Sequence, residues 1–193
     1  MGASVLIFDI PEFETKIMIT ALINHNLDPQ SILTSIRREF DEATIQFVDL
    51  EKTVGHRHVL LASYNALKSC SLDRMISRSL AVEILLYISA ERQITDAIAR
   101  IGVNTATKRI GVIATSSSDE IFPSIKEHLA KSFNEDCNDE LLDEWTEERC
   151  KRVRETFGIS DKEIETVTRS GDSIQQSIQR LTIEKSALLI VRK

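Results

Sequence analysis

Cysteine, glycine and proline are all scarce in this chain of 193 residues. The three cysteines, Cys70, Cys137 and Cys150, include no CxxC pair. Their number and spacing exclude a disulfide framework and a cysteine-based zinc site and are typical of reduced thiols in the cytoplasm. No apolar run approaches the roughly 20 residues that span a bilayer, and the first residues lack the basic flank of a signal peptide. We therefore expect a cytoplasmic protein without a membrane segment.

The chain also lacks the short motifs of common enzyme classes. It has no phosphate loop, no GxGxxG, no GxSxG and no HExxH. His56 and His58 form the only close histidine pair, and residues two apart on a helix point in different directions, so they cannot readily share a metal ion. We expect both histidines at the surface or at a helix start. The residues thus predict no enzyme, no metal site and no cofactor.

Charge is distributed unevenly along the chain. The formal net charge is −6, yet the segment from Lys52 to Arg109 holds nine Lys and Arg against four Asp and Glu. A dipolar chain of this kind can present a basic face to phosphate groups while its overall charge stays negative. The alternative is that these side chains are the ordinary mixed charges of helix surfaces, and the acidic overall balance favours that alternative.

The apolar pattern predicts an α/β protein. Five short runs have strand character, and most are continuously apolar, as strands buried on both faces are. Helical patterns separate them, so we expect a central mixed sheet of about five strands packed with helices, in a single domain over residues 1–193. The five predicted strands are Ala3–Asp9, Thr44–Leu50, Val82–Ser89, Arg109–Thr115 and Ala187–Arg192.

Helix signals lie between these runs. Asp28 and Pro29 are predicted to begin one helix, as its N-cap and its first residue. The spacing of apolar residues predicts further helices. The last of the helices predicted from this spacing is expected to end at Gly102, in a left-handed conformation. Asn138 is predicted to cap a charged helix that ends near Gly158. The helices expected from apolar spacing are His56–Cys70, Ser71–Ser79 and Ile94–Ile101, and the expected capping boxes are Ser117 with Glu120 and Ser160 with Glu163.

The predicted helix 56–70 has apolar residues on two faces. Val59, Ala62, Ala66 and Cys70 form one face, suited to close packing on the sheet or on another helix. Leu61 and Tyr64 point toward the other side. That second face requires cover either by another part of this chain or by a partner protein.

Glu83 is the one carboxylate at the head of an apolar run. Two interpretations are open. In the first, Glu83 is a buried base in a pocket with Glu91–Gln93, and the protein is then a small-molecule-binding or catalytic α/β protein. The second interpretation is that Glu83 pairs with a nearby arginine such as Arg78. The second interpretation is the commoner one in proteins. Nothing else in the sequence completes a set of nucleophile, base and oxyanion donors.

Two stretches together resemble a known family. They read GHRHVLLASYNALK at residues 55–68 and LAVEILLYISAERQITDAI at residues 80–98, followed by IGV at residues 101–103. In this order they are similar to the small kinase-binding accessory subunit of the KEOPS (EKC) complex, and in particular to its archaeal-type members. The best-matching core is residues 53–115.

The resemblance implies a non-catalytic α/β adaptor. Such subunits bind the atypical kinase/ATPase subunit, contact the other KEOPS subunits indirectly, and help recruit tRNA by its 3′ CCA end for threonylcarbamoyladenosine formation at position 37. Single-stranded ends are held by basic side chains and by stacking. On this basis we assign residues to two roles. Nucleic-acid binding is assigned to Arg57, Lys68, Arg74, Arg92 and Gln93, and partner binding to Leu61, Tyr64 and Ile94.

Overall fold

The structure, a computed structural model, describes residues 6–190. Its centre is a sheet in which every neighbouring pair of strands is antiparallel, in the order β1-β2-β4-β3. Within the described residues the sheet has four strands, so the predictions of about five strands and of a mixed sheet are both wrong. The strands are β1 (Leu6–Ile10), β2 (Thr15–Ile23), β3 (Thr44–Asp49) and β4 (Arg109–Ser116).

The two central strands, β2 and β4, are buried on both faces of the sheet. Along β2, Ile17 and Ile19 point into one core while Met18 and Leu22 point into the other. A strand with helices on both sides therefore has a nearly continuous apolar sequence, as β2 and β4 do. β2 is the strand that the sequence analysis missed.

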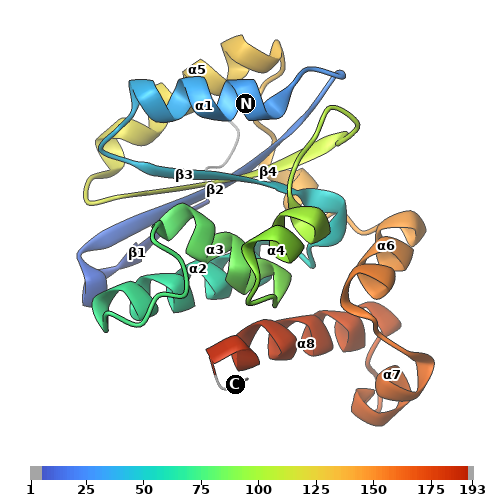
Figure 1. Cartoon of the computed structure of the whole chain (residues 1–193). Helices are drawn as coiled ribbons and strands as arrows, with labels where there is room; N and C mark the ends of the chain where they lie inside the picture. Colours follow the sequence, from blue (N-terminus) through green and yellow to red (C-terminus); the bar gives the residue numbers. More distant parts are fainter. Residues whose placement is uncertain (1–5, 191–193) are drawn as a thin grey trace.

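Helices cover both faces of the sheet, as Figure 1 shows. One face packs against α1 (Pro29–Glu39) and α5 (Phe122–Phe133), and their apolar residues share one core with the strands. The other face packs against α2 (His56–Ser71) and α3 (Leu80–Ser89), with α4 (Ile94–Ile101) beside them.

A third group of helices lies beyond α2 and α3. It consists of α6 (Glu147–Phe157), α7 (Asp161–Val167) and α8 (Ile174–Ala187), and in Figure 1 α8 runs beneath the α2 and α3 layer. Val153, Phe157 and Ile178 contribute to a separate small core there. Short 3-10 helices join the main elements: η1 (Pro11–Phe13), η2 (Leu50–Lys52), η3 (Asp119–Ile121), η4 (Asp139–Leu142) and η5 (Leu188–Ile190).

Two of the five predicted strands are helical. The run predicted as a strand over Val82–Ser89 is most of α3, in which Ala81 and every residue from Glu83 to Ala90 are buried. A helix buried on all sides has no polar stripe, so its sequence is as continuously apolar as that of a buried strand. The second of these predicted strands is Ala187–Arg192. Its residues up to Ile190 belong to the end of α8 and to η5, and its other residues lie outside the described part of the chain. Residues 3–5 of the first predicted strand also lie outside them.

Several helix predictions are confirmed, and several are wrong. The Asp28 N-cap and the Ser160–Glu163 capping box are present, and the charged helix α6 ends at Phe157, near Gly158 as predicted. The helix predicted over Ser71–Ser79 does not form. α2 ends at Ser71, and residues 72–79 are not helical. Gly102 has a φ of −64°, and what requires glycine there is space, since a Cβ would lie 2.4 Å from the carbonyl oxygen of Ile98.

The remaining capping predictions are shifted along the chain. Ser118, not Ser117, caps η3. Asn138 caps η4, and the charged helix α6 is capped by Thr146. On the predicted inner face of α2, Val59, Ala62 and Ala66 are buried as expected, whereas Cys70 is exposed.

The strands at the two edges of the sheet carry side-chain hydrogen bonds. On β3, Arg37 Nε donates to the carbonyl oxygen of Ile45 at 2.8 Å, and Gln46 Nε2 donates to that of Phe47 at 2.8 Å. On β1, the backbone N–H of Leu6 donates to Asp139 Oδ2 at 3.2 Å. Backbone groups of both edge strands are thus bonded within the molecule.

Candidate functional site

A basic pocket lies where the end of α2 meets segment 72–77, α3 and the residues before α4. Its volume is about 410 Å³. Three of the five residues assigned to nucleic-acid binding line it together, and they come from three different segments of the chain. The lining residues are Asn65, Lys68, Ser69, Leu72, Arg74, Ile76, Tyr87 and Arg92.

Among the residues that the structure describes, the pocket is lined by three cations, Lys68, Arg74 and Arg92, and by no carboxylate. Within residues 6–190, Lys68 and Arg74 form no ion pair. Arg92 Nη1 donates to the carbonyl oxygen of Leu189 at 3.4 Å, which brings the end of α8 to the pocket rim. Like charges gathered in a concave site raise the local concentration of anions.

The pocket also offers hydroxyl groups and apolar walls. The hydroxyls of Ser69 and Tyr87 are 2.6 Å apart. Burial raises the pKa of Tyr87, so its hydroxyl stays neutral at physiological pH and keeps a proton to donate. Leu72 and Ile76 are 52% and 36% exposed, respectively. Cations, hydroxyls and exposed apolar side chains in one cavity suit a ligand with phosphate, polar edges and a flat apolar face, as a nucleotide has.

The outer wall of the pocket begins with a Schellman motif at the end of α2. Asp73 lies in the left-handed region with a φ of +53°. Its N–H donates to the carbonyl oxygen of Cys70 at 3.1 Å, and the N–H of Arg74 donates to that of Ser69 at 2.8 Å. The chain therefore turns sharply after α2, which puts Arg74 beside the pocket.

Glu83 is fully buried behind this wall. Its carboxylate accepts from the backbone N–H of Ile76 at 3.0 Å, from that of Ser77 at 2.8 Å and from the Ser77 hydroxyl at 2.9 Å. The prediction that Arg78 pairs with Glu83 is therefore wrong, because backbone amides and a hydroxyl occupy the carboxylate. Glu91 instead forms an ion pair with Arg100. The two carboxylates thus have structural partners, which does not support the alternative of a catalytic pair.

Arg57 and Gln93 do not line the pocket. Arg57 is exposed in the first turn of α2, roughly 16 Å from Lys68 along a helix that rises 1.5 Å per residue. Gln93 is exposed at the N-cap position of α4, next to Arg92. Their assignment to nucleic-acid binding stays a prediction.

The residues assigned to partner binding lie on two surfaces. Tyr64 is covered by this chain, since its hydroxyl donates to Glu12 at 2.7 Å and its ring centroid is 5.4 Å from that of Phe13. Leu61 is half-buried on the same helix. Ile94, in contrast, is 43% exposed on α4.

Ile98 joins Ile94 on the outer face of α4. Ile98 is 51% exposed, and residues four apart on a helix are neighbours on its surface. Ala97 and Ile101 are buried on the inner face of the same helix. The sequence marks Ile98 by the same helical spacing that identifies α4, but spacing alone does not tell which apolar positions face inward.

The histidines are arranged differently from the prediction. His58 is fully buried, with its ring centroid 5.9 Å from that of Phe157, and burial lowers its pKa to about 4. His56 lies at the start of α2 as predicted and pairs with Asp143. Among residues 6–190 no three His, Cys, Asp or Glu side chains are placed to hold a metal ion.

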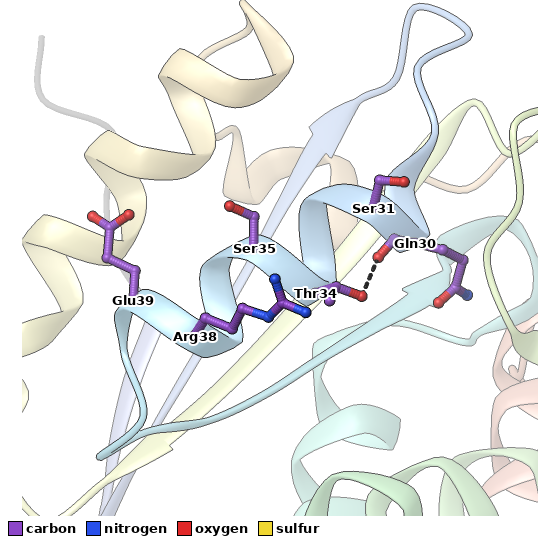
Figure 2. A pocket seen from close by; sticks show the side chains of 6 residues that line it. All are labelled: Gln30, Ser31, Thr34, Ser35, Arg38 and Glu39. Atoms are coloured by element: carbon purple, nitrogen blue, oxygen red, sulfur yellow. Dashed lines mark hydrogen bonds between the residues drawn. The ribbon is translucent and has the colours of Figure 1, made fainter.

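A second hollow, of about 630 Å³, follows the outer side of α1. Figure 2 shows its lining residues spaced along that helix, with the Thr34 hydroxyl donating to the carbonyl oxygen of Gln30 at 2.9 Å. Arg38 and Glu39 bring one charge of each sign, so the hollow lacks the charge excess of the basic pocket. Among the described residues, no helix has the length and apolar character required to cross a membrane.

Comparison with known proteins identifies the family. The profile of the family described as kinase binding protein CGI-121 matches residues 23–188, a wider region than the core predicted from the resemblance. A relative from Coccidioides immitis (strain RS), named EKC/KEOPS complex subunit CGI121, is 27% identical over 92 residues. That match covers 47% of this chain and 43% of the relative, so it spans less than half the length of either protein. The family profile covers most of the chain, and the protein therefore belongs to the CGI-121 family.

Proposed function

We propose that this protein is a non-catalytic subunit of an EKC/KEOPS complex. It binds the kinase subunit through the outer face of α4. Its basic pocket holds the single-stranded 3′ CCA end of tRNA. It thereby recruits tRNA for threonylcarbamoyladenosine formation. The family description supports kinase binding, and the name of the relative supports the complex.

The observation that carries the tRNA proposal is the meeting of Lys68, Arg74 and Arg92 in one pocket, where the described lining residues include no carboxylate. A volume of about 410 Å³ is within the range of sites for small ligands. It is too small for a duplex, but it accommodates a nucleotide at an unpaired end. Basic side chains contact the phosphates, and Leu72 and Ile76 offer apolar surface to a base.

The kinase proposal is based on α4. Neighbouring isoleucines are unusual on a helix surface that faces only solvent. They are typical of helix surfaces that are covered by a protein partner. Ile94 and Ile98 provide such a pair. Leu188 is also 40% exposed, and the carbonyl oxygen of its neighbour Leu189 accepts from Arg92, two residues before Ile94.

The tRNA proposal is tested with Arg74→Ala and a matched control, Arg38→Ala. Arg38 is an exposed arginine on α1, on the opposite face of the sheet (Figures 1 and 2). Binding of tRNA with and without its CCA end is measured by fluorescence anisotropy. We expect Arg74→Ala to weaken binding about tenfold, the loss of one charge-assisted contact, and Arg38→Ala to leave it unchanged. Equal affinity for intact and CCA-less tRNA would contradict the proposal.

The kinase proposal is tested with Ile98→Glu. Ile174→Glu is the control, because Ile174 is an isoleucine on a different helix, 62% exposed at the start of α8. Both variants are expected to fold, since neither side chain is buried. Binding to the purified kinase subunit, measured by calorimetry, is expected to be lost in Ile98→Glu only. If Ile98→Glu binds the kinase as the unmodified protein does, the outer face of α4 is not the interface.

A further inference from the structure

We propose that Glu83 is a positioning residue for the basic pocket: its buried carboxylate holds segment 72–77 in place, and this keeps Arg74 at the pocket wall. The identity of the pocket's ligand depends on the proposed function. The role of Glu83 in fixing the wall does not, because it is argued from hydrogen bonds within the chain.

Segment 72–77 provides three of the eight residues that line the pocket: Leu72, Arg74 and Ile76. It is neither helix nor strand, and Leu72 to Arg74 are exposed. A connection of this kind has no ladder of backbone hydrogen bonds of its own, so its conformation depends on contacts at its ends.

The first end is fixed by the Schellman motif, through the bond from the Arg74 N–H to the carbonyl oxygen of Ser69. The second end is fixed by Glu83. The N–H of Ile76 is 3.1 and 3.0 Å from its two carboxylate oxygens, and the N–H and hydroxyl of Ser77 are 2.8 and 2.9 Å from Oε2. Hydrogen bonds to a charged acceptor are about twice as strong as those between neutral groups.

The anchor itself is rigid. Glu83 lies in the first turn of α3, where the helix dipole favours a negative charge, and α3 is buried along almost its whole length. The wall is thus tied to one of the least mobile elements of the fold. Without the carboxylate the N–H groups of Ile76 and Ser77 lose their acceptor, and the segment has to rearrange to find others.

Electrostatics alone predicts the opposite effect on binding. A carboxylate close to an anion site repels the anion, so removing its charge should strengthen binding. If Glu83 acts by positioning Arg74, removing its charge weakens binding instead. Asp73 provides the matched control, because it is an exposed carboxylate next to Arg74 and its side chain forms no hydrogen bond or ion pair within residues 6–190.

The experiment compares Glu83→Gln with Asp73→Asn. Asparagine tolerates the left-handed conformation at residue 73. Two quantities are measured for each: the affinity for a labelled single-stranded RNA that ends in CCA, and the hydrogen exchange rates of the Ile76 and Ser77 amides. We expect Glu83→Gln to weaken RNA binding at least fivefold and to speed exchange of both amides at least tenfold. Asp73→Asn is expected to bind RNA equally well or up to threefold more tightly, with exchange unchanged.

Unchanged or tighter RNA binding by Glu83→Gln would overturn the proposal, and so would unchanged exchange of the two amides. If Glu83→Gln fails to fold, Ser77→Ala replaces it, because this change removes only the hydroxyl that bonds to Glu83 and to the carbonyl oxygen of Ser79. A smaller weakening in the same direction supports the proposal, and unchanged binding contradicts it. If the unmodified protein does not bind the RNA, the proposed function fails, while amide exchange still decides whether Glu83 holds the wall.

Discussion

The C-terminal helices and the basic pocket use positive charge in opposite ways. Around α6, α7 and α8 four basic side chains form ion pairs: Arg152 with Glu148, Arg154 with Asp161, Arg180 with Asp172 and Lys185 with Glu163. At the pocket, Lys68 and Arg74 have no carboxylate partner among residues 6–190. These four cations are paired within the molecule. Lys68 and Arg74 stay available to a ligand.

Each region also contains one buried charged residue that binds backbone groups. Arg149 is fully buried and donates to four carbonyl oxygens, from Thr53, Leu141, Leu142 and Glu144. Glu83 accepts from two backbone N–H groups. Arg149 joins three segments into a closed structure, whereas Glu83 supports the wall of an open pocket. Substitutions in the C-terminal region should therefore change stability without changing binding, and substitutions of pocket cations should do the reverse.

The largest effect is expected for Arg149→Met. Burial lowers the pKa of Arg149 to about 10, which leaves it charged at neutral pH. Its removal leaves several buried carbonyl oxygens without a donor, and we expect a loss of about 4 kcal/mol in the free energy of unfolding. Urea unfolding followed by circular dichroism measures this. The comparison between regions fails if the loss is under about 1 kcal/mol or if the folded variant binds RNA more weakly.

The second effect concerns His58, which lies where α2 meets Phe157 of the C-terminal helices. Burial lowers its pKa from 6.5 to about 4 in the folded protein, so the unfolded state binds the proton more readily. The stability that His58 contributes is present above pH 6.5 and is lost as the pH falls toward 4. Between pH 7 and pH 5 we expect a loss of about 2 kcal/mol from this group.

The measurement is urea unfolding at both pH values, with His58→Gln as the control. The variant lacks the titrating group and is expected to lose about 2 kcal/mol less than the unmodified protein between pH 7 and pH 5. An equal loss in both proteins would show that other groups cause the acid sensitivity.

The third effect is on binding rather than stability. Lys68→Ala removes one pocket cation, and we expect RNA affinity to fall about tenfold, or about 1.4 kcal/mol. The slope of log affinity against log salt concentration should decrease by about 0.7, the value for one phosphate contact with a single strand. The free energy of unfolding should change by less than about 0.5 kcal/mol, since Lys68 is exposed. A large loss of stability would mean that Lys68 belongs to the packed structure.

The smallest effect is expected for Ser160→Ala, which breaks the capping box of α7. The Ser160 backbone and hydroxyl, with Lys185, lower the pKa of Glu163 to about 2, so the box is intact at neutral pH. Loss of an N-cap costs about 1 kcal/mol. Thermal unfolding should detect this as a small fall in Tm, and RNA affinity is expected to stay the same. A change in RNA affinity would link the two regions and break the comparison.

Much of the fold could be predicted from the sequence, and the two main errors concern α3 and β2. The edge strand β3, the central strand β4 and the amphipathic helices have the periodicities that their burial requires. α3 was mistaken for a strand because a helix buried on all sides has no polar face to reveal its period. β2 was missed although its run of apolar and β-branched residues is as clear as that of β4.

The site could be predicted in part. The excess of basic residues between Lys52 and Arg109 identified Lys68, Arg74 and Arg92, and the resemblance identified the Arg92 region. Their meeting in one pocket could not be predicted, because it depends on the sharp turn after α2. That turn uses Asp73 in a left-handed conformation, where the usual sequence signal is a glycine.

The hydrogen bonds along the edges of the sheet bear on how the molecule can assemble. Exposed strand edges are where foreign segments add to a sheet, whether as recognised peptides or as the start of aggregates. At the β3 border, Arg37 and Gln46 occupy the carbonyl oxygens of Ile45 and Phe47. An added strand would have to displace these side chains before it could pair with β3. These bonds therefore protect the β3 border of the sheet against strand addition.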